Sequence, residues 1–85
     1  MLYLHSKKKA VLQSLISRAF REYRKAHGFS QVKFAKQLQI AVRSYIDLEH
    51  GLFLPSSMTL LLFLLQLDDQ ELLCFLSAIE ETLGS

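Results

Sequence analysis

Apolar side chains recur at intervals of three and four residues along most of the chain, and the strict alternation typical of β-strands is almost absent. In the first third, one such stripe comprises Leu12, Leu15, Ile16, Ala19, Phe20 and Tyr23. Charged residues fall between these positions, which is the pattern of an amphipathic helix with one side on a core. The pattern therefore predicts an all-helical (all-α) fold.

Residues that start and stop helices divide the chain into five predicted helices. Ser30 is suited to cap a helix, Asp68 with Glu71 has the form of a capping box, and Gly28 and Gly51 follow helical runs as left-handed stops. The predicted helices cover about residues 8–27, 31–37, 41–50, 57–67 and 69–83. With 85 residues, we expect one domain, a compact five-helix bundle.

Charge is distributed unevenly along the chain. All ten Lys and Arg residues lie at or before Arg43, whereas residues 47–85 hold seven of the eight acidic residues. A basic half joined to an acidic half indicates an anionic partner on one side only. The run Lys7–Lys9 either contacts that partner or is a solvated face.

Several function classes find no support in the residues. No carboxylate pair, nucleophile–base pair, metal-ligand cluster or phosphate loop stands out, so we expect neither an enzyme, nor a cofactor, nor a metal site. The single cysteine, Cys74, favours a reducing compartment. The apolar run 58–67 is too short to span a membrane, and the N-terminus has no secretory pattern. The expected location is the cytoplasm.

A longer pattern spans the middle of the chain: FREYRKAHGFSQ at 20–31, FAKQL at 34–38, Ile40, LEHG at 48–51 and PS at 55–56. It resembles the Xre/Cro helix-turn-helix family of lambda-repressor-like regulators, over about residues 16–76 without a gap. The resemblance implies a bundle of four or five helices whose second helix lies across the DNA backbone and whose third enters the major groove. Double-stranded DNA is the partner that it implies.

The resemblance assigns roles to individual residues. The base-reading positions are Ala41, Val42, Arg43, Ile46 and Asp47. Phosphate contacts are expected from Gln31, Lys33, Lys36 and Ser44. Arg43 can donate two hydrogen bonds to guanine, and a phosphate clamp is the alternative. Arg24 and Glu49 match a family pair that ties the first helix to the end of the third, so we expect an ion pair between them.

The chain departs from the family pattern around the third helix. Gln39 stands in the turn where the family has Gly, and Ala41 stands where Ser or Thr opens the helix. Val42 and Ile46 occupy exposed positions that are usually polar. A recognition face this apolar indicates either an A·T-rich site or a protein partner.

The fourth predicted helix carries two apolar stripes instead of one, and the second stripe needs a cover. Either the fifth helix covers it within one chain, or a homodimer built from helices four and five does, which we favour. The predicted dimer interface comprises Met58, Leu61, Leu62, Leu65 and Phe75. The first hypothesis is a homodimeric repressor or autoregulator that binds a palindromic site. The second is a protein-interaction module on the same fold, either antitoxin-like or an adaptor. No membrane partner is expected under either hypothesis.

Overall fold

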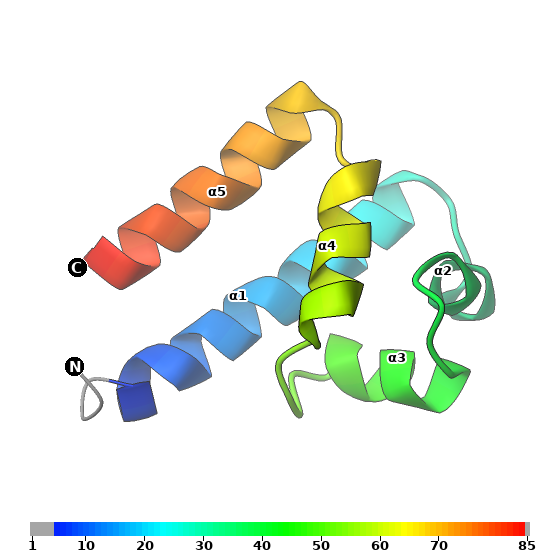
Figure 1. The fold of residues 1–85 in the computed structure, drawn as a ribbon, viewed down its shortest axis with the longest axis horizontal. Helices are drawn as coiled ribbons and strands as arrows, with labels where there is room; N and C mark the ends of the chain where they lie inside the picture. The colour runs from blue at the N-terminus through cyan, green and yellow to red at the C-terminus, as the bar shows by residue number, and fades with distance from the viewer. Residues whose placement is uncertain (1–4, 85) are drawn as a thin grey trace.

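The computed structural model describes residues 5–84, and the side chains of residues 8–84. Within this part the chain forms five helices and no strand: α1 His5–Ala26, α2 Gln31–Gln37, α3 Val42–Glu49, α4 Ser57–Gln66 and α5 Asp69–Gly84. The long helices α1 and α5 run in opposite directions, and α2, α3 and α4 gather around the C-terminal half of α1 (Figure 1). The predicted all-α, five-helix fold is confirmed.

The observed helix ends differ from the predicted ones by a few residues. The first helix begins at His5 instead of about residue 8. The third is shorter at both ends, because Ala41 has extended backbone angles and His50 is already the C-cap. The fourth ends at Gln66, since Leu67 is extended and leads directly into the cap of α5. The fifth continues through Gly84.

The predicted helix starts carry the expected caps. The Ser30 hydroxyl accepts a hydrogen bond from the Lys33 amide at 3.0 Å. At α5 the Glu71 amide donates to Asp68 at 2.7 Å, and the Asp68 amide donates to the Glu71 carboxylate at 2.9 Å. This reciprocal capping box pairs two amides that the helix itself leaves without partners.

Three helices end in the same left-handed turn. Gly28, Gln39 and Gly51 have φ of +71°, +60° and +73° and follow α1, α2 and α3. At each one, two backbone hydrogen bonds close the last turn, as in Ile40 N–H to Ala35 and Gln39 N–H to Lys36, both 3.0 Å. This is the Schellman arrangement, which favours glycine because a Cβ is strained there. Gln39 is the one of the three that carries a side chain.

Aromatic rings form the centre of the core. Phe20 stacks on Phe63 with ring centroids 4.0 Å apart, and Phe34 lies edge-on to Tyr45 at 5.4 Å. Phe75 is 7% exposed and meets Phe63 edge-on at 5.5 Å. Its assignment to a dimer interface is therefore wrong, because the ring joins α5 to α4 inside one chain. The buried core comprises Ile16, Phe20, Tyr23, Phe34, Ala35, Leu38, Tyr45, Leu48, Phe63 and Phe75.

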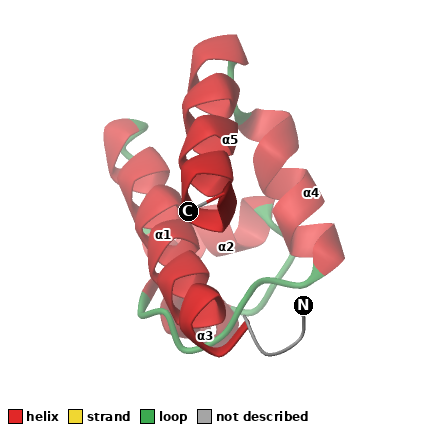
Figure 2. Ribbon diagram, turned by 90° about the vertical axis from the view of Figure 1, so that its left-hand side faces the viewer, coloured by secondary structure: helices red, strands yellow, loops and turns green. Residues whose placement is uncertain are grey.

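The free ends of α1 and α5 are tied together. The Lys8 ammonium donates to the backbone oxygens of Thr82 and Leu83 at 3.3 and 3.1 Å. These carbonyls lie in the last turn of α5, where a positive charge is favourable (Figure 2). Lys8 therefore acts within the fold, while the side chain of Lys7 lies outside the described residues.

Candidate nucleic-acid interface

Helices α2 and α3 are joined by a tight turn and pack closely on each other and on α1. Leu38 at the end of α2 and Leu48 in α3 are both almost fully buried. The left-handed Gln39 reverses the chain between the two helices, and Ile40 packs on the core as α3 begins. The first described helix thus supports a helix-turn-helix unit.

A single carboxylate, Glu49, joins these helices at their common centre. Its side chain is ionically paired with Arg24 of α1, whose Nε lies 2.5 Å from one carboxylate oxygen and whose Nη2 lies 3.2 Å from the other. The Gln31 amide donates to the same carboxylate at 3.2 Å, and the Tyr45 hydroxyl donates to it as well. Since Glu49 is 3% exposed, these donors replace the water that it loses.

The ionisation of this cluster follows from its contacts. Burial alone would raise the pKa of Glu49, but hydrogen bonds from Arg24, Tyr45 and Gln31 outweigh burial and lower its pKa. Burial, followed by the hydrogen bond to Glu49 and then the Glu49 charge, raises the pKa of the Tyr45 phenol. Glu49 is therefore charged and Tyr45 is neutral at physiological pH, which suits a donor–acceptor pair.

The outer face of α3 presents the residues that the sequence assigned to base reading. The Arg43 side chain is 83% exposed, and its Nε lies 3.6 Å from the Asp47 carboxylate one turn later. Ala41 is exposed, whereas Ile46 and Asp47 are half-buried. The Arg43 guanidinium is thus paired with Asp47 along the helix and remains exposed to solvent.

Val42 differs from the expectation that it points outward. It is half-buried and packs against the core. Its apolar character therefore has a role in the fold, because the side chain packs against the core at the first residue of α3. Among the predicted base-reading residues, Ile46 is the large apolar side chain that does not pack against the core.

The expected phosphate contacts lie along α2 and the start of α3. Lys36 is exposed, and the Lys33 ammonium lies 5.2 Å from the centre of the Phe29 ring, as in a cation–π contact. Gln31 is half-buried, because its amide is bonded to Glu49, and Ser44 is half-buried on α3. The α2 N-terminus is capped by Ser30, and the positively charged residues within α2 and α3 are Lys33, Lys36 and Arg43.

The sequence did not identify every contributor to this region. The hydrogen bond from the Tyr45 hydroxyl to Glu49 was not predicted. Tyr45 lies four residues before Glu49 on the same helix, and this spacing places the two side chains side by side. The sequence also did not identify Leu52 and Phe53, between α3 and α4, as exposed apolar residues.

Three large apolar side chains form an exposed surface on the outer side of α4. Leu65 is 82% exposed, and Met58 and Leu61 are also exposed, whereas Leu62 packs partly on the core. No Asp, Glu, Lys or Arg occurs from His50 to Leu67, so α4 itself contributes no charge to this surface. Among residues 5–84, no helix is both long and apolar enough to cross a membrane.

Comparison with known proteins agrees with this geometry. A family model described as helix-turn-helix matches residues 20–68, which is more than half of the 85-residue chain. The matched range runs from the buried Phe20 in α1 to the Asp68 cap of α5, so it contains α2, α3 and α4 entirely. No curated protein and no solved structure matches significantly.

Proposed function

Because the chain belongs to the Xre and lambda-repressor-like helix-turn-helix family, whose members are DNA-binding transcription regulators, we propose that it binds a specific palindromic DNA site as a homodimer. Repression or autoregulation is the proposed role, since a bound dimer excludes other proteins from the same stretch of promoter. The proposal rests on the exposed face of α3 and on the rigid base beneath it.

The observation that carries the proposal is the position of Arg43. Its guanidinium is exposed on α3, while Glu49 on the opposite side of the same helix is held by donors from α1 and α2. A recognition helix needs this combination, because base reading requires a side chain that reaches outward from a helix whose orientation is fixed. Arg43 has the geometry to donate two hydrogen bonds to a guanine.

Gln31, Lys33, Lys36 and Ser44 are the proposed phosphate contacts. Lys33 and Lys36 supply charge on α2, and the Gln31 side chain is oriented by its bond to Glu49. Ala41, Ile46 and Asp47 flank Arg43 as the remaining proposed base-contacting positions, since Val42 packs against the core. An exposed methyl at Ala41 and the Ile46 side chain suit the thymine methyl group, and the Asp47 carboxylate suits a cytosine amino group.

We propose that the dimer forms through the outer side of α4. Met58, Leu61 and Leu65 are exposed there. Two copies of an uncharged apolar surface are complementary to each other without any charge to be matched. Such a dimer presents two α3 helices, as a palindrome with half-sites about 34 Å apart requires.

Selection of bound duplexes from a random DNA pool at about 0.15 M salt tests the proposal. We expect enrichment of a palindrome with half-sites about one helical turn apart. Arg43→Ala is expected to lower affinity for the selected duplex about tenfold or more and to relax preference at one base pair per half-site. Arg18→Ala, which removes the same charge from α1, is the matched control and is expected to keep the selected sequence.

A protein-interaction module is the second candidate function, and the exposed apolar surface of α4 is the observation that favours it. The two functions differ in their dependence on salt. DNA binding weakens steeply as salt rises, because bound counterions are released from phosphates. A pool without an enriched sequence, together with Arg43→Ala and Arg18→Ala behaving alike, would reject the sequence-reading function.

A further inference from the structure

One side of α5 carries a regular row of exposed side chains. The members of this row, called the α5 stripe below, are separated alternately by four and three residues: Asp69, Leu73, Leu76, Glu80 and Leu83. This alternation places side chains in one line along a helix, and it is the spacing of the seam of a coiled coil. The α5 stripe therefore has the geometry of a surface that pairs with another helix.

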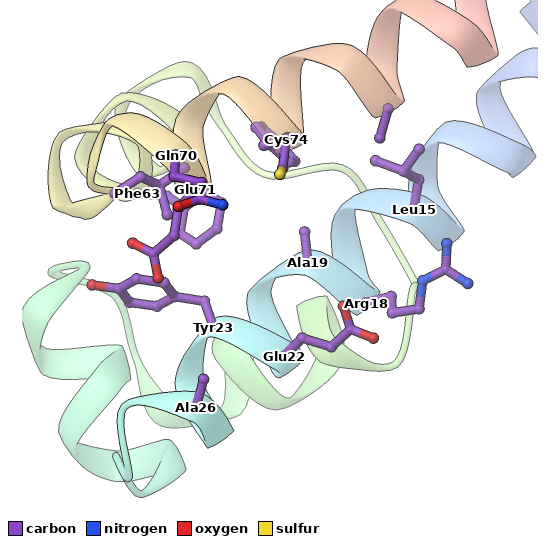
Figure 3. A pocket seen from close by; sticks show the side chains of 13 residues that line it. Leu15, Arg18, Ala19, Glu22, Tyr23, Ala26, Phe63, Gln70, Glu71 and Cys74 are labelled. Atoms are coloured by element: carbon purple, nitrogen blue, oxygen red, sulfur yellow. The ribbon is translucent and has the colours of Figure 1, made fainter.

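The α5 stripe is separate from the side of α5 that faces the rest of the fold. Phe75 is buried against Phe63 of α4, and Cys74 points toward α1, where a cavity of about 470 Å³ lies between the two helices (Figure 3). No member of the stripe lines this cavity. Because α5 forms one edge of the molecule (Figure 1), its outward side is open to a partner.

Three leucines give the α5 stripe its apolar area. Leu73 is 66% exposed, Leu83 is 53% exposed and Leu76 is 47% exposed. The outward side of a surface helix is ordinarily polar, because only the inward side packs on the core. A row of leucines on the outward side indicates that a partner covers it.

The charges of α5 decide which partner fits. This helix holds four acidic residues and no Lys, Arg or His. Two of the acidic residues, Asp69 and Glu80, belong to the α5 stripe, and neither has an ion pair or a side-chain hydrogen bond within the described part of the chain. Covering an unpaired carboxylate is costly, so the partner has to bring positive charge to these two positions.

A second copy of α5 does not meet this requirement. In a parallel pair of α5 helices, Glu80 faces Glu80 and Asp69 faces Asp69, which places like charges together. In an antiparallel pair centred on Leu76, both carboxylates face leucines and are covered without a countercharge. An anionic membrane surface is repelled by the same acidic residues.

We propose that the α5 stripe binds a basic amphipathic helix of another protein. The partner helix has Lys or Arg opposite Asp69 and Glu80 and apolar side chains opposite the three leucines. The apolar residues provide buried area, and the charge pairs fix the register of the two helices. The proposed DNA contacts lie on α2 and α3 and the proposed dimer surface lies on α4, so this inference can fail without them, and they without it.

A synthetic amphipathic helix of about 20 residues is the probe. It has leucine opposite each leucine of the α5 stripe and lysine opposite Asp69 and Glu80, and it is made with this row in each of the two chain directions. Glutamate replaces both lysines in the control peptides. Calorimetry with the full chain at about 0.15 M salt measures binding. We expect saturable binding of a lysine peptide and at least about tenfold weaker binding of its glutamate counterpart.

Reversing one charge on α5 tests the register. Glu80→Lys is expected to weaken binding of the lysine peptide at least about tenfold and to strengthen binding of the glutamate peptide. Glu22→Lys makes the same change at an exposed position of α1 and is expected to leave both affinities unchanged. Leu76→Ala is expected to weaken binding about tenfold, whereas Leu61→Ala on α4 is not. Thermal unfolding of each variant checks that it is folded.

Several outcomes would overturn the proposal. These are no binding of the lysine peptide in either direction, equal affinities of the lysine and glutamate peptides, and equal effects of Glu80→Lys and Glu22→Lys. Self-association of the chain that is lost in Leu76→Glu and kept in Leu65→Glu would also overturn it, because the α5 stripe would then be covered by a second copy.

Discussion

Glu49 is the residue on which the arrangement of the first three helices depends most. Its buried carboxylate accepts hydrogen bonds from Arg24 of α1, Gln31 of α2 and Tyr45 of α3. A side chain near the end of one helix thus fixes the positions of two others. Because the Arg24 side chain is also largely buried, each partner depends on the other for compensation of its charge.

Replacing this carboxylate tests its contribution to stability. Glu49→Gln keeps the shape but leaves the Arg24 guanidinium without a countercharge, and we expect the free energy of unfolding to fall by about 3–5 kcal/mol. Urea denaturation followed by circular dichroism measures the change. Glu80→Gln removes an exposed carboxylate and is expected to change stability by less than about 0.5 kcal/mol. Equal losses in the two variants would contradict a special role for Glu49.

The same residue predicts a pH dependence. A carboxyl group whose pKa is lower in the folded chain stabilises the fold above its unfolded pKa, near 4.5 for Glu, and this stabilisation is lost as pH falls through the folded value. Glu49 and Glu71 are both lowered. We therefore expect the free energy of unfolding to fall below about pH 4.5, and to fall less steeply in Glu49→Gln. Denaturation curves from pH 7 to pH 3 decide this, and parallel pH profiles would refute it.

Gln39 shows where a single residue conflicts with its backbone. Its φ of +60° is the left-handed conformation that Gly28 and Gly51 adopt at the ends of α1 and α3. Gln39→Gly removes the steric cost of the side chain, and we expect a gain of about 1 kcal/mol, or about 4–8 °C in Tm. Differential scanning calorimetry measures it. Gln13→Gly, inside α1, is the control and is expected to lower Tm, because glycine there weakens the helix.

At the scale of helices, the sequence predicted the capping residues better than the exact helix ends. Ser30, Ser56 and the pair Asp68 with Glu71 form the caps of α2, α4 and α5. Each acts through hydrogen bonds to amides three residues away, so local sequence suffices to place it. The start of α3 is the exception, since Ala41 makes no side-chain cap bond.

That missing cap provides a prediction for α3. Ala41 already has the extended backbone of an N-cap, with φ −66° and ψ 147°. Ala41→Ser is therefore expected to stabilise the chain by about 1 kcal/mol, because the hydroxyl can accept from an unpaired amide of the first turn. Thermal unfolding measures the gain, and Ser30→Ala is expected to give a loss of similar size. A Ser at position 41 that left Tm unchanged would show that water already satisfies those amides.

At the scale of the whole molecule, the outer side of α4 bears on assembly. Leu65→Glu introduces a charge at the most exposed large apolar side chain and is expected to convert the proposed dimer to a monomer. Sedimentation equilibrium measures the mass, and affinity for a palindromic duplex is expected to fall at least about tenfold with loss of the second half-site. Val11→Glu, on α1, is the matched control. A wild-type chain that sediments as a monomer at all accessible concentrations would reject this interface.

The family resemblance indicated the helix-turn-helix unit, and the sequence by itself determined the all-α fold class and the five helices. These follow from apolar periodicity, caps and left-handed stops, which act between residues close in the chain. It also indicated the pairing of Arg24 with Glu49 through the family resemblance. Helix ends at Ala41 and Leu67 were displaced by a residue, because the cap geometry, and not the apolar pattern, decides where a helix begins and ends.

Only the tertiary structure decided how similar side chains are divided between core and surface. Phe75 and Leu65 are both apolar residues of the C-terminal half, yet one is buried against Phe63 and the other is in solvent. Lys8 is similar in sequence context to its neighbours but binds the end of α5. The cavity between α1 and α5 likewise has no sequence signature. Burial, pairing and cavities depend on where distant helices meet, and helical periodicity specifies a face without specifying its neighbour.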